Sequence, residues 1–186
     1  MREELLEIYS SSGKKTGKKA TKSYIHKKGL FHATVHVWIF SEKGNVLIQK
    51  RSTKKELNPG VWDVSVAGHV EYKEDIKAAA IRETFEETGI HIKEKDLFKL
   101  GIYTSESNHS KIIDREFHYT YILKIDEVKI NLNYKNDEVD DLKLISLREM
   151  DLLLNQNSRD IFIGKNKNYY KDVFEAILKI TKENYQ

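Results

Sequence analysis

The sequence predicts one mixed α/β domain built in layers, and three observations support that fold class. The chain has 186 residues, which suits a single domain with a sizeable core. Hydrophobic residues make up 39% and charged residues 33%, a balance typical of globular proteins. The expected elements run as several strands, one central helix, more strands and then helices. This order favours helices packed on a sheet.

Cysteine content and apolar runs exclude several classes of protein. The chain contains no cysteine, which excludes disulfide scaffolds, zinc sites made of thiolates and cysteine nucleophiles. No stretch approaches the roughly 20 apolar residues of a membrane span, and the first residues, MREELL, lack a basic-then-apolar signal pattern. We therefore expect a cytoplasmic protein without a membrane partner.

The positive charge is small but clustered. A net charge of +3 does not by itself predict a nucleic-acid partner, and we expect none. One short segment nevertheless carries Lys14, Lys15, Lys18, Lys19, Lys22, Lys27 and Lys28. Two interpretations stay open: a solvated surface, or a positive rim that attracts phosphorylated ligands.

The N-terminal third is expected to consist mainly of strands. Residues 5–9 form an apolar run that ends in a Ser-rich turn, and residues 21–28 predict a short helix that stops at Gly29. The run FHATVHVWIF, residues 31–40, is aromatic and β-branched and predicts a long strand. Turn residues follow it, so residues 46–50 are expected to pair back on it as a hairpin.

The rest of the chain alternates between strands and helices. After the turn Asn58-Pro59-Gly60, residues 61–67 predict a strand. A helix is expected over 75–88, closed by Gly89. Later strands are expected at 98–104, 117–125 and 142–145. Ser146 and Glu149 resemble a capping box for a helix near 147–154, and residues 170–181 have helical periodicity.

Three acids lie on one face of the central helix. Glu83, Glu86 and Glu87 stand at i, i+3 and i+4, where like charges cost about a few tenths of a kcal/mol per pair. They also lie near the helix C-terminus, which disfavours anions. A divalent cation such as Mg²⁺ or Mn²⁺ would explain the arrangement, and a solvated acidic face is the alternative. Ala78, Ile81 and Phe85 are expected to face the core, while Ala79 and Ala80 leave room for a ligand.

A fixed spacing joins these acids to residues on either side. The specified positions are Gly68, Glu74, Arg82, Glu83, Glu86, Glu87, Gly89 and Ile90. In this spacing the segment 68–90 resembles the Nudix box, and the chain is identified as similar to the Nudix hydrolase (MutT-like) superfamily. One departure is Thr84, which stands where that family prefers an aliphatic residue.

The resemblance implies a fold, a reaction and a set of roles. Nudix enzymes have a three-layer α/β/α fold with a mixed sheet, and they use water and Mg²⁺ or Mn²⁺ to split a diphosphate linked to a group X. Glu83, Glu86, Glu87 and the carbonyl of Gly68 match the metal ligands. Glu74 and Arg82 match a pair that orients the box. The general base varies in the family, so Glu86, Glu87, Asp137 and Glu138 stay open for that role.

Two flanking stretches resemble a branch of the same superfamily. PGVWDVSVAGH, residues 59–69, and HKKGLFH, residues 26–32, are similar to type 1 isopentenyl-diphosphate isomerases. Those isomerases bind a metal through three histidines and two glutamates. The matching positions here are His26, His32, His69, Asp114 and Glu116, with Asp114 as a shorter substitute. This implies a second metal site, and separate surface histidines beside an acidic strand edge are the alternative.

The reaction class follows from what the chain keeps and lacks. The isomerases have a cysteine just before the Gly-His pair, where this chain has Ala67. Their Nudix box is usually degraded, whereas this one is intact. The sequence therefore predicts a metal-dependent hydrolase of a nucleoside di- or triphosphate or a related nucleotide derivative. Two alternatives stay open: an isomerase of isoprenoid diphosphates, and a non-catalytic nucleotide-binding module.

Other side chains have weaker signals. Lys50 and Arg51 end a strand and are expected either to hold phosphate or to be solvated. Trp38, Trp62, Phe31 and Tyr103 are expected in the core or on strand faces, with stacking on a base as the alternative. His36 alternates with apolar residues and is expected to be a hydrogen-bonded, half-buried histidine rather than a metal ligand.

The domain prediction is one Nudix domain over residues 1–186. Within it, residues 1–30 form an N-terminal extension, 31–155 the core and 156–186 a C-terminal helical segment. The first thirty residues and the last helix are expected to pack on the core or to make a homodimer contact, and the sequence leaves both open. The expected partner is a small-molecule diphosphate.

Overall fold

A computed structural model describes residues 3–109, 111–155 and 166–183 of the chain. The strands are β1 (Leu5–Tyr9), β2 (Lys15–Thr21), β3 (His32–Ser41), β4 (Val46–Arg51), β5 (Trp62–Asp63), β6 (Val66–His69), β7 (Phe98–His109), β8 (Ile112–Ile125) and β9 (Val139–Ile145). The helices are α1 (Lys22–Lys28), α2 (Ile76–Thr88), α3 (Leu147–Asn155) and α4 (Lys167–Glu183), with short 3₁₀ turns η1 (Glu94–Asp96) and η2 (Glu127–Lys129).

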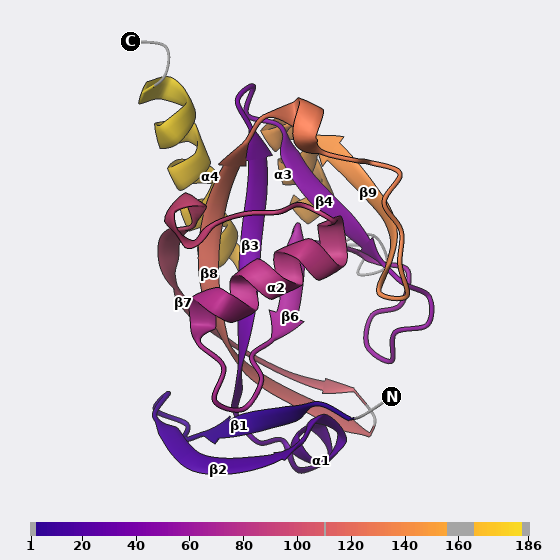
Figure 1. The fold of residues 1–186 in the computed structure, drawn as a ribbon, viewed down its shortest axis with the longest axis vertical. Coiled ribbons are helices and arrows are strands. Elements are labelled where there is room, and N and C mark those ends of the chain that lie inside the picture. Colours follow the sequence, from indigo (N-terminus) through magenta and orange to yellow (C-terminus); the bar gives the residue numbers. More distant parts are fainter. Residues whose placement is uncertain (1–2, 110, 156–165, 184–186) are drawn as a thin grey trace.

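The main sheet lies between two helical layers. Its strand order is β5-β4-β3-β8-β7, with β6 paired to β3 and β9 paired to β4. The central pair β3–β8 is parallel and the other pairs are antiparallel, so the sheet is mixed. Helix α2 covers one face, and α3 and α4 cover the other (Figure 1). The predicted three-layer α/β/α fold with a mixed sheet is therefore confirmed.

Each face of the sheet has its own core because strand residues alternate between faces. Val35 and Val37 of β3 pack on the α2 side with Ala79 and Ala80. Trp38 and Phe40 face the other side and pack with Met150 of α3 and Val173 of α4. All of these side chains are buried.

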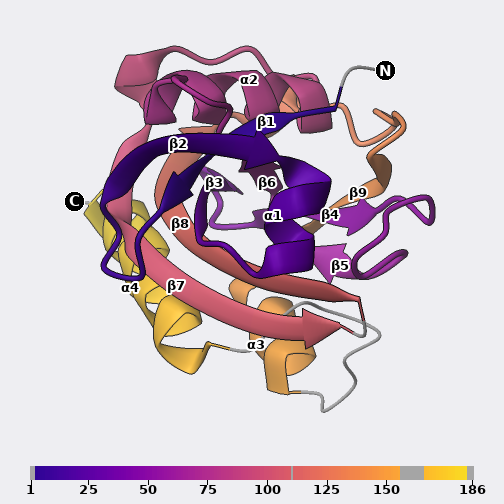
Figure 2. The same cartoon turned by 90° about the horizontal axis from the view of Figure 1, so that it is seen from below.

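The N-terminal segment covers one end of the sheet. Strands β1 and β2 form a separate two-stranded sheet, and with α1 they lie across that end (Figure 2). Backbone bridges from Leu6 to Glu71 and from Tyr9 to Phe31 join it to the core. The helix 22–28 ends at Gly29 as predicted, but strand β2 was not foreseen in the lysine-rich segment. Its residues 15–19 are exposed.

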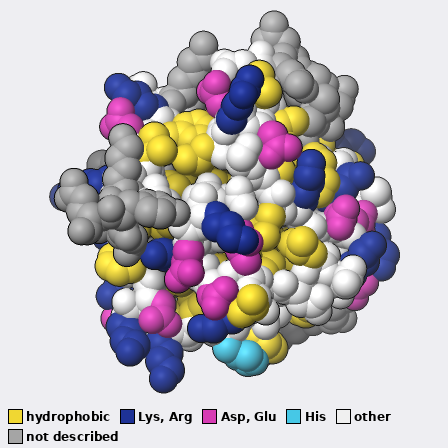
Figure 3. Space-filling view, turned by 90° about the horizontal axis from the view of Figure 1, so that it is seen from above, with side chains coloured by type: hydrophobic (Ala, Val, Ile, Leu, Met, Phe, Trp, Pro, Cys, Tyr) yellow, Lys and Arg dark blue, Asp and Glu magenta, His cyan; other side chains and the backbone are white. Residues whose placement is uncertain are grey.

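The opposite end of the molecule carries charges of both signs. Acidic and basic side chains are interspersed there with hydrophobic ones (Figure 3). Over the part of the chain that the structure describes, no helix combines the length and the apolar character needed to cross a membrane.

Two strand predictions needed correction. Residues 46–51 form β4, which pairs with β3 at Phe40 and Val46, with β5 at Gln49 and Lys50, and with β9 over most of its length. The predicted hairpin is present but short, because β6 occupies that edge of β3 from Thr34 to Val37. The strand predicted over 61–67 is split in two. At the break, Ser65 Oγ donates to the carbonyl of Leu47 and accepts from the amide of Ile39.

The box helix α2 has the predicted ends but a different buried face. Asp75 Oδ1 caps its first turn, and Gly89 closes it with a φ of 71°. Ile81 packs against the core as predicted, but Ala78 and Phe85 face outward, and Phe85 is 44% exposed. Ala79 and Ala80 are fully buried in the core and do not line a ligand space. The small alanine face approaches the sheet closely and carries Glu83 and Glu87 inward with it.

Candidate active site

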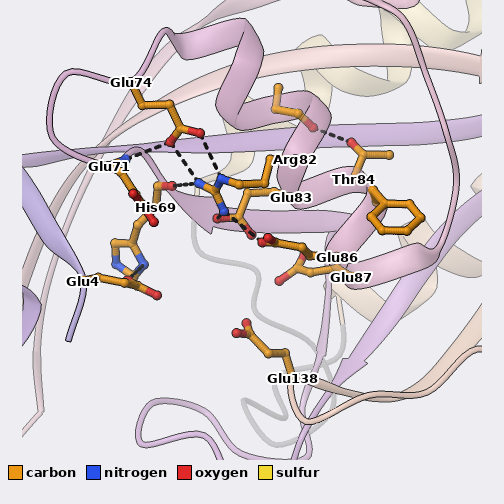
Figure 4. A network of polar contacts seen from close by, with 12 residues as sticks. Glu4, His69, Glu71, Glu74, Arg82, Glu83, Thr84, Glu86, Glu87 and Glu138 are labelled. Atoms are coloured by element: carbon orange, nitrogen blue, oxygen red, sulfur yellow. Dashed lines mark hydrogen bonds and ion pairs between the residues drawn. The ribbon is translucent and has the colours of Figure 1, made fainter. Parts of the chain in front are cut away.

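Arg82 connects the box loop with the end of α2. Its Nε and Nη2 each donate to Glu74 at 2.9 Å, a bidentate pair. Nη2 also donates to the carbonyl of His69 at 3.0 Å. Nη1 donates to Glu83 at 2.7 Å and to Glu86 at 2.8 Å (Figure 4). One guanidinium therefore orders three of the four acids that the spacing singled out, Glu74, Glu83 and Glu86.

We call Glu83, Glu86 and Glu87 the box carboxylates, and two of them are buried. Glu83 is 7% exposed and Glu87 only 1%. Oε2 of Glu87 accepts from Gln49 Nε2 at 2.7 Å and from the amide of Ala67 at 2.8 Å. Burial raises the pKa of Glu83 to about 7 and that of Glu87 to about 8, and the Glu83 charge adds to the second shift. A cation is the partner that would offset this cost.

Strand β6 lies against the box carboxylates. A Cβ added to Gly68 would lie 2.0 Å from Cδ of Glu83, so a hydrogen at this position leaves space for that carboxylate. Ala67 on one side bonds to Glu87, and the His69 carbonyl on the other bonds to Arg82. Residues 67–69 therefore hold three members of the box in place.

A loop from residue 131 to β9 brings a further acid to this end of α2. The carboxylate of Glu138 points toward the box carboxylates (Figure 4). Lys55 donates to it, and although burial works in the other direction, this hydrogen bond lowers the pKa of Glu138. Asn136 Oδ1 accepts from the amide of Glu138 at 2.7 Å, and its Nδ2 donates to the carbonyl of Glu86. A single amide side chain thus ties Glu138 to the box helix.

A second group of ligand atoms lies at the β1–β2 end of the sheet. We call it the histidine cluster, and its members are His26, His32, His69, Asp114 and Glu116. The three imidazoles offer atoms within 4.8 Å of one another, and His32 forms another such group with the two acids. His32 Nε2 lies 3.5 Å from Glu116 Oε1, and His26 Nε2 lies 3.7 Å from Asp114 Oδ1.

Several polar atoms of the histidine cluster are buried close together and have no hydrogen-bond partner among the described residues. They are Nε2 of His26, His32 and His69 and Oδ1 of Asp114. Buried polar atoms normally find one. A bound cation would satisfy four such atoms in one place, and imidazole nitrogens with carboxylate oxygens suit a divalent transition metal. The residues present therefore fit a metal.

The protonation of the cluster agrees with this. Burial lowers the pKa of His26 to about 4 and the pKa of His69 well below its ordinary value, so both rings are neutral, the form that binds metals. Burial raises the pKa of Asp114 to about 7, and the neighbouring Glu116 charge adds to the shift. At His32, burial opposes the charged form, but the Glu116 carboxylate 3.5 Å from Nε2 outweighs it and raises the pKa.

The structure brings together nearly all the residues singled out from the sequence, with one exception. Arg51 Nη1 donates to buried Asp63 at 3.2 Å beside the site. Lys50 has no hydrogen bond or ion pair to either cluster within the described ranges. Sequence reasoning missed Gln49, Lys55 and Asn136, because no motif marks a strand glutamine or loop residues whose partners lie tens of residues away.

Comparisons with known proteins agree with this geometry. A family model described as NUDIX domain matches residues 30–163. The chain is 31% identical to an uncharacterized Nudix hydrolase of Clostridium acetobutylicum, over 96% of this chain and 98% of that relative. It is 34% identical to isopentenyl-diphosphate Delta-isomerase 2 of Photorhabdus laumondii, over 77% of each chain.

The fold has a close counterpart among solved structures. A protein from Deinococcus radiodurans superposes with a TM-score of 0.67 at 18% identity. The match covers 95% of this chain and 98% of that chain. At this identity the likeness concerns the fold, which extends over both the N-terminal segment and the helices that follow the sheet.

Proposed function

This chain belongs to the Nudix family and is a Nudix hydrolase, and on that premise we propose that it cleaves the diphosphate linkage of a nucleoside di- or triphosphate or a related nucleotide derivative. The observation that supports this most directly is the set of box carboxylates at the end of α2, of which Arg82 orders Glu83 and Glu86 while Gln49 and the amide of Ala67 order Glu87. Water is the nucleophile, and the substrate is a small-molecule diphosphate.

The box carboxylates, together with the carbonyl oxygen of Gly68, are the residues that would hold Mg²⁺ or Mn²⁺. When bound, the cation neutralises the charge of the diphosphate and orients the attacking water. Glu74 and Arg82 act by orientation, because their hydrogen bonds fix the positions of Glu83 and Glu86. Arg51 and Lys55, rather than Lys50, are proposed to contact phosphate oxygens, and the contact of Lys55 with Glu138 opposite the box supports this.

Glu138 is the proton acceptor in this proposal. Its hydrogen bond from Lys55 keeps it ionised at neutral pH, whereas burial raises the pKa of Glu83 and Glu87. As the water oxygen forms its bond to phosphorus, the proton passes to the Glu138 carboxylate and the bridging P–O bond breaks. Asp137 is 85% exposed and pairs with Lys54, so it is not assigned this role.

The histidine cluster is proposed as a second cation site. Its neutral imidazoles and its unsatisfied buried atoms support this assignment. The ion would supply a fixed positive charge beside the diphosphate. The likeness to an isomerase does not extend to its chemistry, because the methyl group of Ala67 cannot exchange a proton with carbon.

The one-domain organisation over residues 1–186 is also a proposal. The bridges from β1 to Phe31 and Glu71 support an N-terminal extension that packs on the core. The proposed boundary at 156 lies outside the described residues. Cytoplasmic location and a homodimer contact likewise stay proposals.

The test is hydrolysis of a panel of diphosphate compounds with Mg²⁺ or Mn²⁺. The panel contains nucleoside di- and triphosphates, nucleotide sugars, dinucleotide cofactors and isopentenyl diphosphate. We expect one nucleotide class to be hydrolysed, with loss of activity in chelator and a fall of about 10³-fold in Glu87→Gln. This substitution keeps the acceptor for Gln49 and Ala67, so the fold should persist.

Glu175→Gln is the matched control. Glu175 is an exposed helical acid paired with Lys171 on α4, away from the box. Its removal should leave the rate unchanged. Nucleotide binding without turnover would instead favour the non-catalytic module, and conversion of isopentenyl diphosphate would favour the isomerase.

A further inference from the structure

The sheet face opposite α2 carries a second pair of imidazoles next to the histidine cluster. Side chains alternate along β3, so His32, Thr34, His36 and Trp38 share this face. His36 lies beside Ala67 on β6 and Thr120 on β8. Its ring stacks on that of His118, with centroids 4.2 Å apart.

This part of the face is accessible although it lies in the middle of the sheet. His36 and His118 belong to the two central strands, where side chains under a helical layer are normally buried. Both rings are partly exposed, and so are Ala67 and Ser105 beside them. Trp38, further along β3, is fully buried against α4. On β3 the partly exposed His36 therefore lies between buried Thr34 and buried Trp38.

A chain of hydrogen bonds runs from Trp38 through Tyr169 to Nδ1 of His36 and indicates which nitrogen of this ring carries a proton. Trp38 Nε1 can only donate, and it donates to the Tyr169 hydroxyl at 2.7 Å. The hydroxyl hydrogen is then available for His36 Nδ1, which lies 2.9 Å away. Burial, with the neighbouring His118 adding to it, lowers the pKa of His36 well below its ordinary value, so the ring is neutral. In the tautomer that accepts this hydrogen at Nδ1, Nε2 carries the proton and is a donor.

The other ring of the pair is held just as firmly. His118 lies between Thr34 Oγ1 at 2.8 Å and Ser105 Oγ at 2.7 Å. Its Nδ1 is 3.5 Å from Glu116 of the histidine cluster. Two hydrogen-bonded polar rings thus adjoin the histidine cluster, whose proposed ion would lie beside the diphosphate.

We propose that His36 binds the uncharged polar group on the far side of the diphosphate, donating Nε2–H to an acceptor atom on the base or ribose of a nucleotide. This inference rests on the proposed function and adds the group that selects the substrate. An isoprenyl chain has no acceptor and would leave the Nε2–H donor buried without a partner, which a polar site penalises strongly. The His36 face accordingly favours a nucleoside over an isoprenoid.

The experiment compares two amides at this position. The amide of His36→Gln reaches about as far as Nε2, whereas that of His36→Asn ends near Nδ1 and keeps only the Tyr169 contact. For the nucleoside triphosphate that the wild type prefers, we expect His36→Asn to lower kcat/KM about tenfold through KM, and His36→Gln to stay within about threefold. Inorganic triphosphate, which has no nucleoside, should be cleaved equally by all three proteins.

Hydrolysis of abasic ribose 5-triphosphate shows whether the acceptor for His36 lies on the ribose or on the base. If its kcat/KM also falls in His36→Asn, the acceptor is on the ribose, and otherwise it is on the base. Two results would overturn the inference and leave the proposed hydrolase standing. One is that kcat/KM for the nucleoside triphosphate falls equally in His36→Asn and His36→Gln. The other is that kcat/KM falls as much with inorganic triphosphate as with the nucleoside triphosphate. A wild type that cleaves none of these compounds would overturn both.

Discussion

The box carboxylates and the histidine cluster share strand β6, but their polar atoms are satisfied differently. At the box, Arg82, Gln49 and the amide of Ala67 hold the carboxylates in place. In the histidine cluster, four buried ligand atoms have no hydrogen-bond partner among the described residues. The box is organised by the protein itself, whereas the histidine cluster is proposed to depend on an ion. Loss of an ion should therefore affect stability at the cluster and catalysis at the box.

The largest expected effect is loss of the ion from the histidine cluster. We expect the purified protein to retain about one transition metal per chain after dialysis, and His32→Ala to retain none. An ion present at about a thousand times its Kd contributes roughly 4 kcal/mol of stability. Its removal should lower Tm by about 8–16 °C. Elemental analysis and thermal unfolding, with and without a strong chelator, measure both quantities.

Glu87→Gln separates the two regions in the same assay. It should keep the retained metal and the Tm, because Gln49 and Ala67 still have their acceptor. Equal metal content in wild type and His32→Ala, or a Tm that does not respond to the chelator, would contradict the assignment of the cluster as an ion-dependent region.

The next effect concerns Gly68, at the point where β6 meets the box. A methyl group in Gly68→Ala would lie 2.0 Å from Glu83 Cδ, so the carboxylate must move away from its place. The end of a side chain moves more easily than backbone, and we expect kcat/KM to fall about 100-fold with little change in Tm. Steady-state kinetics and thermal unfolding together provide the test.

Gly101→Ala is the matched control for a strand glycine. Its added methyl group would lie 3.2 Å from the Tyr103 ring and far from the box helix in the fold. We expect full activity in this variant. If Gly68→Ala is as active as Gly101→Ala, Glu83 does not need its observed position.

Local signals in the sequence predicted the box helix and its acids, but not which face is buried. Asp75 and Gly89 mark the ends of α2 by capping chemistry, which depends on a few neighbouring residues. The buried face was predicted wrongly because the carboxylates Glu83 and Glu87 turn toward the sheet, against the ordinary rule that acids face solvent. At a functional site that rule is overridden, and a hydrophobic pattern cannot reveal it.

Contacts between residues far apart in the sequence were the other feature that the sequence alone could not fully predict. The family resemblance named the five members of the histidine cluster, and the structure places them together from α1, β3, β6 and β8. The predicted pairing of β4 with β3 exists, but its longer pairing with β9 was not foreseen because it joins residues about 90 positions apart. The Glu138–Lys55 and Asn136–Glu86 contacts have the same origin, since they depend on how two loops meet in the fold.

A smaller expected effect is a pH dependence of the cation affinity at the box. Burial raises the pKa of Glu83 to about 7 and that of Glu87 to about 8. At pH 6 both carboxylates are therefore mostly protonated, and a cation that binds at the box must displace these protons. Above pH 8 the protons are mostly absent. Mn²⁺ affinity there should rise about tenfold or more between pH 6 and pH 8. Titration of Mn²⁺ by electron paramagnetic resonance, after the tightly bound metal is in place, measures it.

The stability of the protein without a cation at the box should fall as pH rises, whereas the cation affinity should increase. Between about pH 4.5 and pH 8 the unfolded chain has released these protons while the folded chain still holds them, so stability falls as pH rises. Glu87→Gln has no proton to release at this position and should flatten both profiles. Profiles identical to the wild type would contradict the raised pKa of Glu87.

The smallest effect we predict lies at Asn136, which joins the box helix to the proposed base. Asn136→Ala removes the acceptor for the amide of Glu138 and the donor to the carbonyl of Glu86. The carboxylate remains but is less well positioned, so kcat should fall about fivefold with KM unchanged. Asn131→Ala, which loses only a contact to the amide of Asn133, should have no effect. In a Glu138→Gln background, Asn136→Ala should cause no further loss, because both changes act through one group. The same fivefold loss in both backgrounds would mean that Asn136 supports the helix alone and that Glu138 takes its position from Lys55.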